Sequence, residues 1–108
     1  MSADIPESDW RRFKEVHQKL LERFCSRTLD EVAAATQGME GCAYDRYVKV
    51  YKLIRERDKE LAKVFDDFRR STAVIQLGMM QRMKLLTDEE LSVFSEQTRA
   101  HIEAVASL

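Results

Sequence analysis

The residues best suited to chemistry are two histidines and two cysteines, and their spacing matches no usual site. His17, Cys25, Cys42 and His101 are separated by 8, 17 and 59 positions, whereas zinc ligands come mostly in close pairs. The Glu-x-x-His motif of carboxylate-bridged di-iron bundles does not occur in the sequence. We therefore expect no metal site and no cofactor.

Other kinds of catalytic group are also missing from the sequence. It has no glycine-rich phosphate loop and no serine, histidine and aspartate set whose spacing suggests a catalytic triad. With three Gly and one Pro, few loops remain to position a substrate. The cysteines have no recognisable activating neighbour, and we expect them to be free and buried as small apolar side chains. We predict that the protein is not an enzyme.

The elements that must position these residues are helices. Of the 108 residues, 44% are hydrophobic and 34% are charged, and the scarcity of Gly and Pro argues against a β-sandwich. Apolar residues recur every three or four positions in the first third of the chain, which predicts a helix over about 8–36 that ends at Gly38. A turn at 39–41 separates it from a second helix over about 42–84.

The second helix carries a seam typical of a coiled coil. The seam positions alternate in steps of three and four and are mostly apolar: Tyr44, Tyr47, Tyr51, Ile54, Asp58, Leu61, Phe65, Phe68, Thr72, Ile75 and Met79. A continuous helix over 42–84 would be about 63 Å long, whereas a compact chain of this size is about 34 Å across. Either the helix breaks near Ser71, or it packs against a second copy of the chain. We favour a dimer formed through this helix.

The segment after the possible break is the most apolar part of the chain. Residues 73–86 place apolar side chains around nearly the whole helix, which predicts that it is buried. Gly78 lies within it and would allow a close helix crossing. Three of the five methionines lie here, and Met-rich surfaces adapt to different partners. Together with a neighbouring arginine pair they form the expected partner-binding surface: Arg69, Arg70, Met79, Met80 and Met83.

Two capping signals place the last two helices. Thr87 begins a capping box, which predicts a short helix over about 88–93, and Ser95 caps a helix over about 96–106. The expected fold is therefore all-α and forms a single domain. It consists of a long antiparallel helical hairpin that carries short C-terminal helices in a bundle-like arrangement.

His17 and Asp58 are the polar members of two apolar stripes. In an antiparallel hairpin the facing positions sum to about 79, which places His17 one turn away from Asp58. A buried pair of these residues would fix the register of the hairpin or form a pH-sensitive site. The alternative is a partly exposed His17 and an Asp58 that pairs with a neighbouring basic residue.

Net charge and hydropathy argue against several classes of function. The net charge of −1 gives no preference for nucleic acid or for an anionic membrane, and the longest uncharged apolar stretch, 73–81, is too short to span a bilayer. No signal peptide is visible, and free cysteines suit a reducing cytoplasm. We expect a small cytoplasmic protein-interaction or regulatory module that binds itself or another protein by helix-face recognition.

Two other functions stay open. The segment 87–106 has a weak helix-turn-helix pattern. In a DNA-binding regulator of this type, Gln97, Thr98 and Arg99 would contact the bases. Against this stand the short first helix and the lack of a basic surplus. The other function is that of a helical bundle that binds a hydrophobic ligand. Its cavity would be lined by Trp10, Tyr44, Tyr47 and Tyr51.

Overall fold

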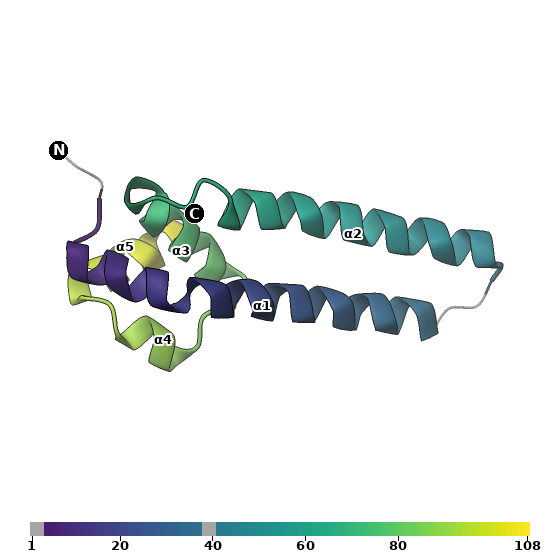
Figure 1. Cartoon of the computed structure of the whole chain (residues 1–108), viewed down its shortest axis with the longest axis horizontal. Coiled ribbons are helices and arrows are strands. Elements are labelled where there is room, and N and C mark those ends of the chain that lie inside the picture. Colours follow the sequence, from purple (N-terminus) through teal and green to yellow (C-terminus); the bar gives the residue numbers. More distant parts are fainter. Residues whose placement is uncertain (1–3, 38–40) are drawn as a thin grey trace.

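The computed structural model describes residues 4–37 and 41–108, and over these residues the fold is all-α, as the sequence predicts (Figure 1). The elements are α1 (Glu7–Gln37), α2 (Ala43–Phe65), the 3₁₀ turn η1 (Arg70–Thr72), α3 (Ala73–Arg82), α4 (Asp88–Ser92) and α5 (Glu96–Ala106). Within the two described ranges, no helix is both long enough and apolar enough to cross a membrane.

The two long helices form an antiparallel hairpin, and the three short helices pack at one end of it (Figure 1). The molecule measures 55 × 26 × 23 Å and its radius of gyration is 16.5 Å, compared with about 13 Å for a compact chain of this length. The other end of the hairpin extends away from the short helices. We call this part the distal hairpin, and it comprises residues 25–37 of α1 and 43–58 of α2.

The second helix ends at Phe65, so the continuous helix predicted to about 84 does not form. The break occurs at 66–69, slightly before the predicted position at Ser71. Asp67 adopts the left-handed conformation with φ of 55°, and the Gln76 amide of α3 donates a 2.5 Å hydrogen bond to the carbonyl of Asp66. The chain folds back on itself here, and the length of the second helix is therefore no longer an argument for a dimer.

The core lies where α3 and α5 pack at the end of the hairpin that is formed by the start of α1 and the end of α2. Its largest fully buried side chains come from α1, α3, α5 and the segment before α4: Phe13, Leu20, Leu77, Met80, Leu85, Thr98 and Ile102. A Cβ atom on Gly78 would overlap the side chain of Val105 and lie 3.3 Å from the carbonyl oxygen of Ile102. The close helix crossing predicted at Gly78 is therefore present, between α3 and α5.

A buried carboxylate joins the start of α1 to the start of α5. Asp9 accepts hydrogen bonds from the Ser95 amide at 2.9 Å, the Ser95 hydroxyl at 2.6 Å and the Thr98 hydroxyl at 2.6 Å. Burial by itself would raise the pKa of Asp9, but these hydrogen bonds outweigh it and the pKa is lowered. Ser95 also caps α5 as predicted, because its hydroxyl accepts a hydrogen bond from the Thr98 amide.

A second polar contact joins α1 to α4. The Arg23 guanidinium donates to both carboxylate oxygens of Glu90, at 2.7 and 3.1 Å, and also to the carbonyl of Leu85 at 2.6 Å. The hydrogen bond from Arg23 lowers the pKa of Glu90, although burial alone would raise it. Glu90 also closes the predicted capping box with Thr87. Arg27, at the start of the distal hairpin, also donates to the carbonyls of Met83 and Lys84, at 3.3 and 2.9 Å. The short helices are thus fixed to α1 as far as Arg27, and the remainder of the distal hairpin lacks such cover in the described chain.

Candidate interaction surface

The distal hairpin carries an apolar face that the described part of the chain leaves uncovered. Its large apolar side chains are about half exposed or more: Leu29 at 67%, Tyr44 at 72%, Tyr47 at 69%, Tyr51 at 55% and Ile54 at 48%. The four residues from α2 belong to the predicted coiled-coil seam. Further along the same seam Leu61 is half-buried and Phe65 is buried. The seam is therefore buried only at the end nearest the core.

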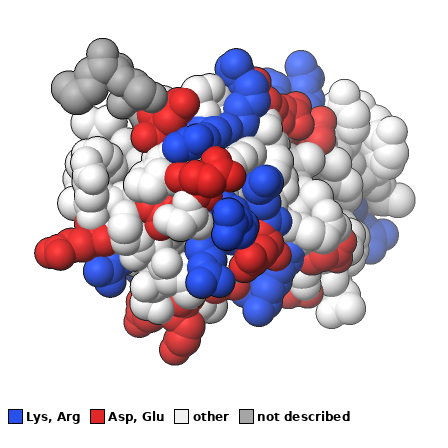
Figure 2. Space-filling model, turned by 60° about the vertical axis from the view of Figure 1, so that its left-hand side comes forward, with Lys and Arg blue, Asp and Glu red and all other residues white. Residues whose placement is uncertain are grey.

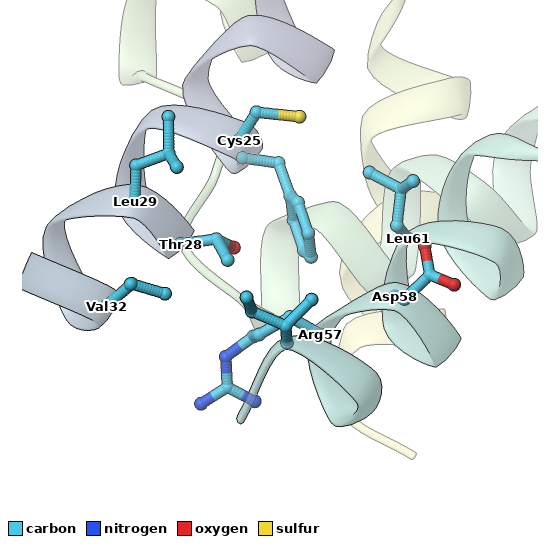
Figure 3. A pocket seen from close by; sticks show the side chains of 9 residues that line it. Cys25, Thr28, Leu29, Val32, Arg57, Asp58 and Leu61 are labelled. Atoms are coloured by element: carbon cyan, nitrogen blue, oxygen red, sulfur yellow. The ribbon is translucent and has the colours of Figure 1, made fainter. Parts of the chain in front are cut away.

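An apolar groove runs between the two helices of the distal hairpin. Its first part has a volume of about 270 Å³ and ends at Ile54, where a second hollow of about 440 Å³ begins. Figure 3 shows the first part, with Cys25, Thr28, Leu29 and Val32 on α1 and Arg57, Asp58 and Leu61 on α2. The second hollow is lined by Thr36, Ala43, Arg46, Tyr47, Val50, Tyr51 and Ile54. The two hollows share Ile54 in their linings and so follow one another along the hairpin.

Of the two charged residues that line the first part of the groove, Arg57 is ion-paired within the described part of the chain and Asp58 is not. Arg57 donates two hydrogen bonds to Glu31 across the hairpin, at 3.1 and 2.9 Å, and one to Glu60 at 3.2 Å. The bond from Arg57 lowers the pKa of Glu31, and the same bond raises the pKa of Arg57. Asp58 is exposed and forms no ion pair with any residue in the described ranges. Its carboxylate is therefore available to a group from outside the chain.

The predicted buried pair of His17 and Asp58 does not form. Asp58 is exposed, whereas the His17 ring is half-buried and stacks on Phe68 at a centroid distance of 3.6 Å. The physical reason is the break after Phe65, which brings Phe68 over the histidine where a continuous helix would have placed other residues. The Nε2 atom of His17 is buried without a hydrogen-bond partner, and burial lowers the pKa of the ring.

The two cysteines are free, as predicted, but they are exposed and not buried. Cys25 lies at the edge of the groove and Cys42 is the N-cap residue of α2. Among the described residues, none of the three short helices packs over either position. The prediction of burial was wrong, because the described helices leave both positions open to solvent.

The five residues predicted to bind a partner do not form one open face. Met80 is fully buried in the core, and Met79 and Met83 are half-buried against it. Arg69 pairs with Asp67 at 2.6 Å, and Arg70 donates to the Ile5 carbonyl at 2.7 Å and to Glu7 at 3.2 Å. The prediction was wrong for Met80, because it shares with Ala73 and Leu77 the face of α3 that is buried in the core. The exposed large apolar side chain on α3 is that of Ile75.

The structure also bears on the residues of the two alternative functions. Thr98 is buried and bonded to Asp9, so its side chain is not available to contact a base together with Gln97 and Arg99. Figure 2 shows a face on which basic and acidic side chains are interleaved. A surface of mixed charge provides little attraction for phosphates.

The four aromatic residues proposed to line a ligand cavity lie apart. Trp10 packs on Phe68 with ring centroids 4.8 Å apart, near the start of α1. Tyr47 and Tyr51 instead line the second hollow together with Thr36, near the end of α1. Trp10 and Thr36 are about 39 Å apart along the helix. The prediction of a single cavity lined by Trp10 and the tyrosines is therefore wrong.

A metal centre would need ligands brought together by the fold. In the ranges 4–37 and 41–108 no three His, Cys, Asp or Glu side chains are grouped so as to hold a metal ion.

No family model matches the chain, and no match was found among curated proteins or solved structures. What the sequence analysis missed is the contribution of α1 to the groove, made by Cys25, Leu29 and Val32. Their spacing of four and three residues was a usable signal, because it places them on one face of a helix. The groove is thus the feature of the described chain best suited to binding.

Proposed function

We propose that the protein is a small interaction or regulatory module that works by helix-face recognition, with the distal hairpin as its binding surface and without catalysis. The observation that carries this proposal is the apolar face at Leu29, Tyr44, Tyr47, Tyr51 and Ile54, which is exposed beside a groove. Contiguous apolar surface of this kind marks interaction sites in soluble proteins. Tyrosine is also enriched in interfaces, because it adds a hydroxyl to a large apolar ring.

The shape of the groove supports recognition of a helix. Its two parts follow the hairpin axis and meet at Ile54, so that successive side chains of a bound helix can enter them. Helix-in-groove binding uses apolar side chains at positions i, i+3, i+4 and i+7, which present one apolar face. Rows of residues with this spacing also line the groove itself, on both α1 and α2.

The chemistry of the groove favours binding over catalysis. Its walls are mainly apolar, and the charged groups Glu31 and Arg57 at one side are bonded to each other. A catalytic site instead needs polar groups that converge on a substrate. We also propose that the protein works in the cytoplasm, where the exposed thiols of Cys25 and Cys42 would stay reduced.

Photocrosslinking in living cells tests the proposed surface. A benzoylphenylalanine residue replaces Tyr51 in one variant and Glu56, an exposed residue on the opposite side of α2, in the other. We expect a covalent adduct from position 51 and none from position 56, and we expect Ile54→Glu to suppress the adduct. Mass spectrometry then identifies the molecule attached. Equal labelling from both positions, or no adduct from position 51, contradicts the proposed surface.

A further inference from the structure

We propose that the apolar face of the distal hairpin binds a second copy of this chain, with α2 of one copy packed antiparallel against α2 of the other. This inference rests on the proposed function, because it names the partner of the same surface. Three observations lead to it: the surplus of exposed area, the self-complementary seam on α2 and the position of Asp58 within that seam.

The exposed area of the single chain is larger than a compact monomer needs. The chain exposes 7266 Å², whereas a compact monomer of 12.6 kDa would expose about 6,200 Å². The surplus of about 1,000 Å² is close to the area of about 800 Å² that each partner buries in a standard stable interface. A single additional copy is thus enough to give the chain the burial expected for its mass.

The seam on α2 is able to pair with an identical seam. From Tyr44 to Leu61 its positions alternate in steps of three and four, which is the spacing that keeps two helices in contact. A twofold axis midway between Tyr51 and Ile54 makes the facing positions sum to about 105. Each Tyr51 then lies opposite Ile54 of the second copy. Every contact occurs twice because the same patch is used on both sides.

Asp58 is the polar member of the seam, and this register gives it a partner. It is exposed and forms no ion pair within the described ranges. In the antiparallel register it lies opposite Tyr47 of the second copy, whose hydroxyl can donate a hydrogen bond to the carboxylate. A single polar residue in an apolar seam fixes the register of a coiled coil in this way. The carboxylate therefore selects one alignment among those that the apolar residues permit.

Light scattering on a sizing column, run over a dilution series, measures the mass of the full chain. We expect about 25 kDa at high concentration, twice the chain mass of 12.6 kDa. Tyr51→Glu and Asp58→Lys should shift the mass toward that of the monomer. Ile75→Glu is the matched control, because Ile75 is a similarly exposed apolar residue on α3, and it should leave the dimer intact. Far-ultraviolet circular dichroism checks that each variant keeps its helix content.

A mass of 12.6 kDa at every concentration overturns the inference, and so does a dimer that withstands both Tyr51→Glu and Asp58→Lys. The proposed function has a separate failure. A monomer whose position 51 crosslinks to a different protein overturns the second copy as occupant but keeps the interaction surface. A monomer that yields no adduct from position 51 overturns both.

The antiparallel register can be tested with one thiol. Cys25→Ser leaves Cys42 as the only cysteine, and Cys42 lies at the exposed start of α2. In the proposed register the two Cys42 residues are about 30 Å apart, whereas a parallel pair would place them about 10 Å apart. Pulsed dipolar spectroscopy on a nitroxide label at Cys42 measures this distance. A short distance overturns the antiparallel arrangement.

Discussion

The carboxylate of Asp9 accepts a 2.6 Å hydrogen bond from the hydroxyl of Thr98, which lies 89 positions later in the chain. This contact brings the first turn of α1 to the first turn of α5, where a negative charge also interacts favourably with the helix dipole. It holds the short helices at one end of the hairpin. The distal hairpin is left uncovered as a consequence.

Replacing Asp9 by alanine should lower the free energy of unfolding by about 2–3 kcal/mol, because Ser95 and Thr98 lose a buried charged acceptor. Urea denaturation followed by circular dichroism measures the change. Asp45→Ala, at an exposed site in the first turn of α2, should change the free energy by less than about 0.5 kcal/mol. Equal effects at the two positions would show that the buried contact adds no stability.

The Asp9 carboxylate should also make the free energy of unfolding fall at low pH. Because the pKa of Asp9 is lowered on folding, its contribution is complete above the ordinary carboxyl value of 3.8 and is lost as the pH falls through the lower folded value. Asp9→Asn should therefore reduce the loss of stability between about pH 4 and pH 2. Thermal unfolding across this range measures the difference. If the variant lost as much stability as the wild type over this pH range, the lowered pKa of Asp9 would be contradicted.

Arg23→Met should destabilise the protein by about 2–4 kcal/mol, because it leaves the buried Glu90 carboxylate with only the exposed Lys19 ammonium, at 3.9 Å, as a cationic partner. Chemical denaturation measures the loss. Arg12→Met is the matched control, since the Arg12 pair with Glu15 is more than half exposed, and exposed pairs contribute about 0–1 kcal/mol. If the two variants lose the same stability, the contact between α1 and α4 does not hold the short helices in place.

His17 should make stability depend on pH near neutrality. Burial among Phe13, Phe65 and Phe68 lowers its pKa, so the folded state favours the neutral ring. The contribution of His17 to stability is complete above the ordinary histidine pKa of about 6.5 and is lost as the pH falls below that value. His17→Phe should flatten the stability profile between about pH 7 and pH 5. Nuclear magnetic resonance titration of the ring in the wild type should give a pKa below that of free histidine. A value above it would contradict the burial.

Gly78→Ala should lower the free energy of unfolding by about 1–3 kcal/mol, because the added methyl group overlaps Val105 at the crossing of α3 and α5. Adding Val105→Ala should restore part of that loss, since it removes the overlapping atoms. A double-mutant cycle by thermal denaturation measures the coupling. If the two losses simply add, the close crossing is not what requires glycine.

Much of the fold follows from local signals in the sequence. The bounds of α1 to within one residue, the capping box at Thr87, the N-cap at Ser95 and the close crossing at Gly78 agree with the prediction. The cap predicted at Gly38 and the turn at 39–40 lie outside the described residues. The break after Phe65 was placed too late, because it depends on the amide of Gln76 reaching back to the carbonyl of Asp66. Such a contact between two elements leaves no periodic trace in the sequence.

The binding surface could be predicted only in part. The spacing of Tyr44, Tyr47, Tyr51 and Ile54 identified a seam on the second helix. Spacing alone does not tell which part of a seam the rest of the chain covers, and here the short helices cover only the part near Phe65. For the same reason Met80 was assigned to a partner-binding surface, although its side chain is fully buried in the core.

Hydrogen exchange of the wild-type chain, compared between dilute and concentrated solutions, tests most directly whether the distal hairpin is the surface that binds a second copy. We predict that backbone amides in residues 43–58 exchange more slowly in the concentrated solution, because association suppresses local opening of that part of α2. The amides of α3 should exchange at the same rate in both solutions. Equal exchange of residues 43–58 at the two concentrations, or slowing confined to α3, would contradict self-association through this face.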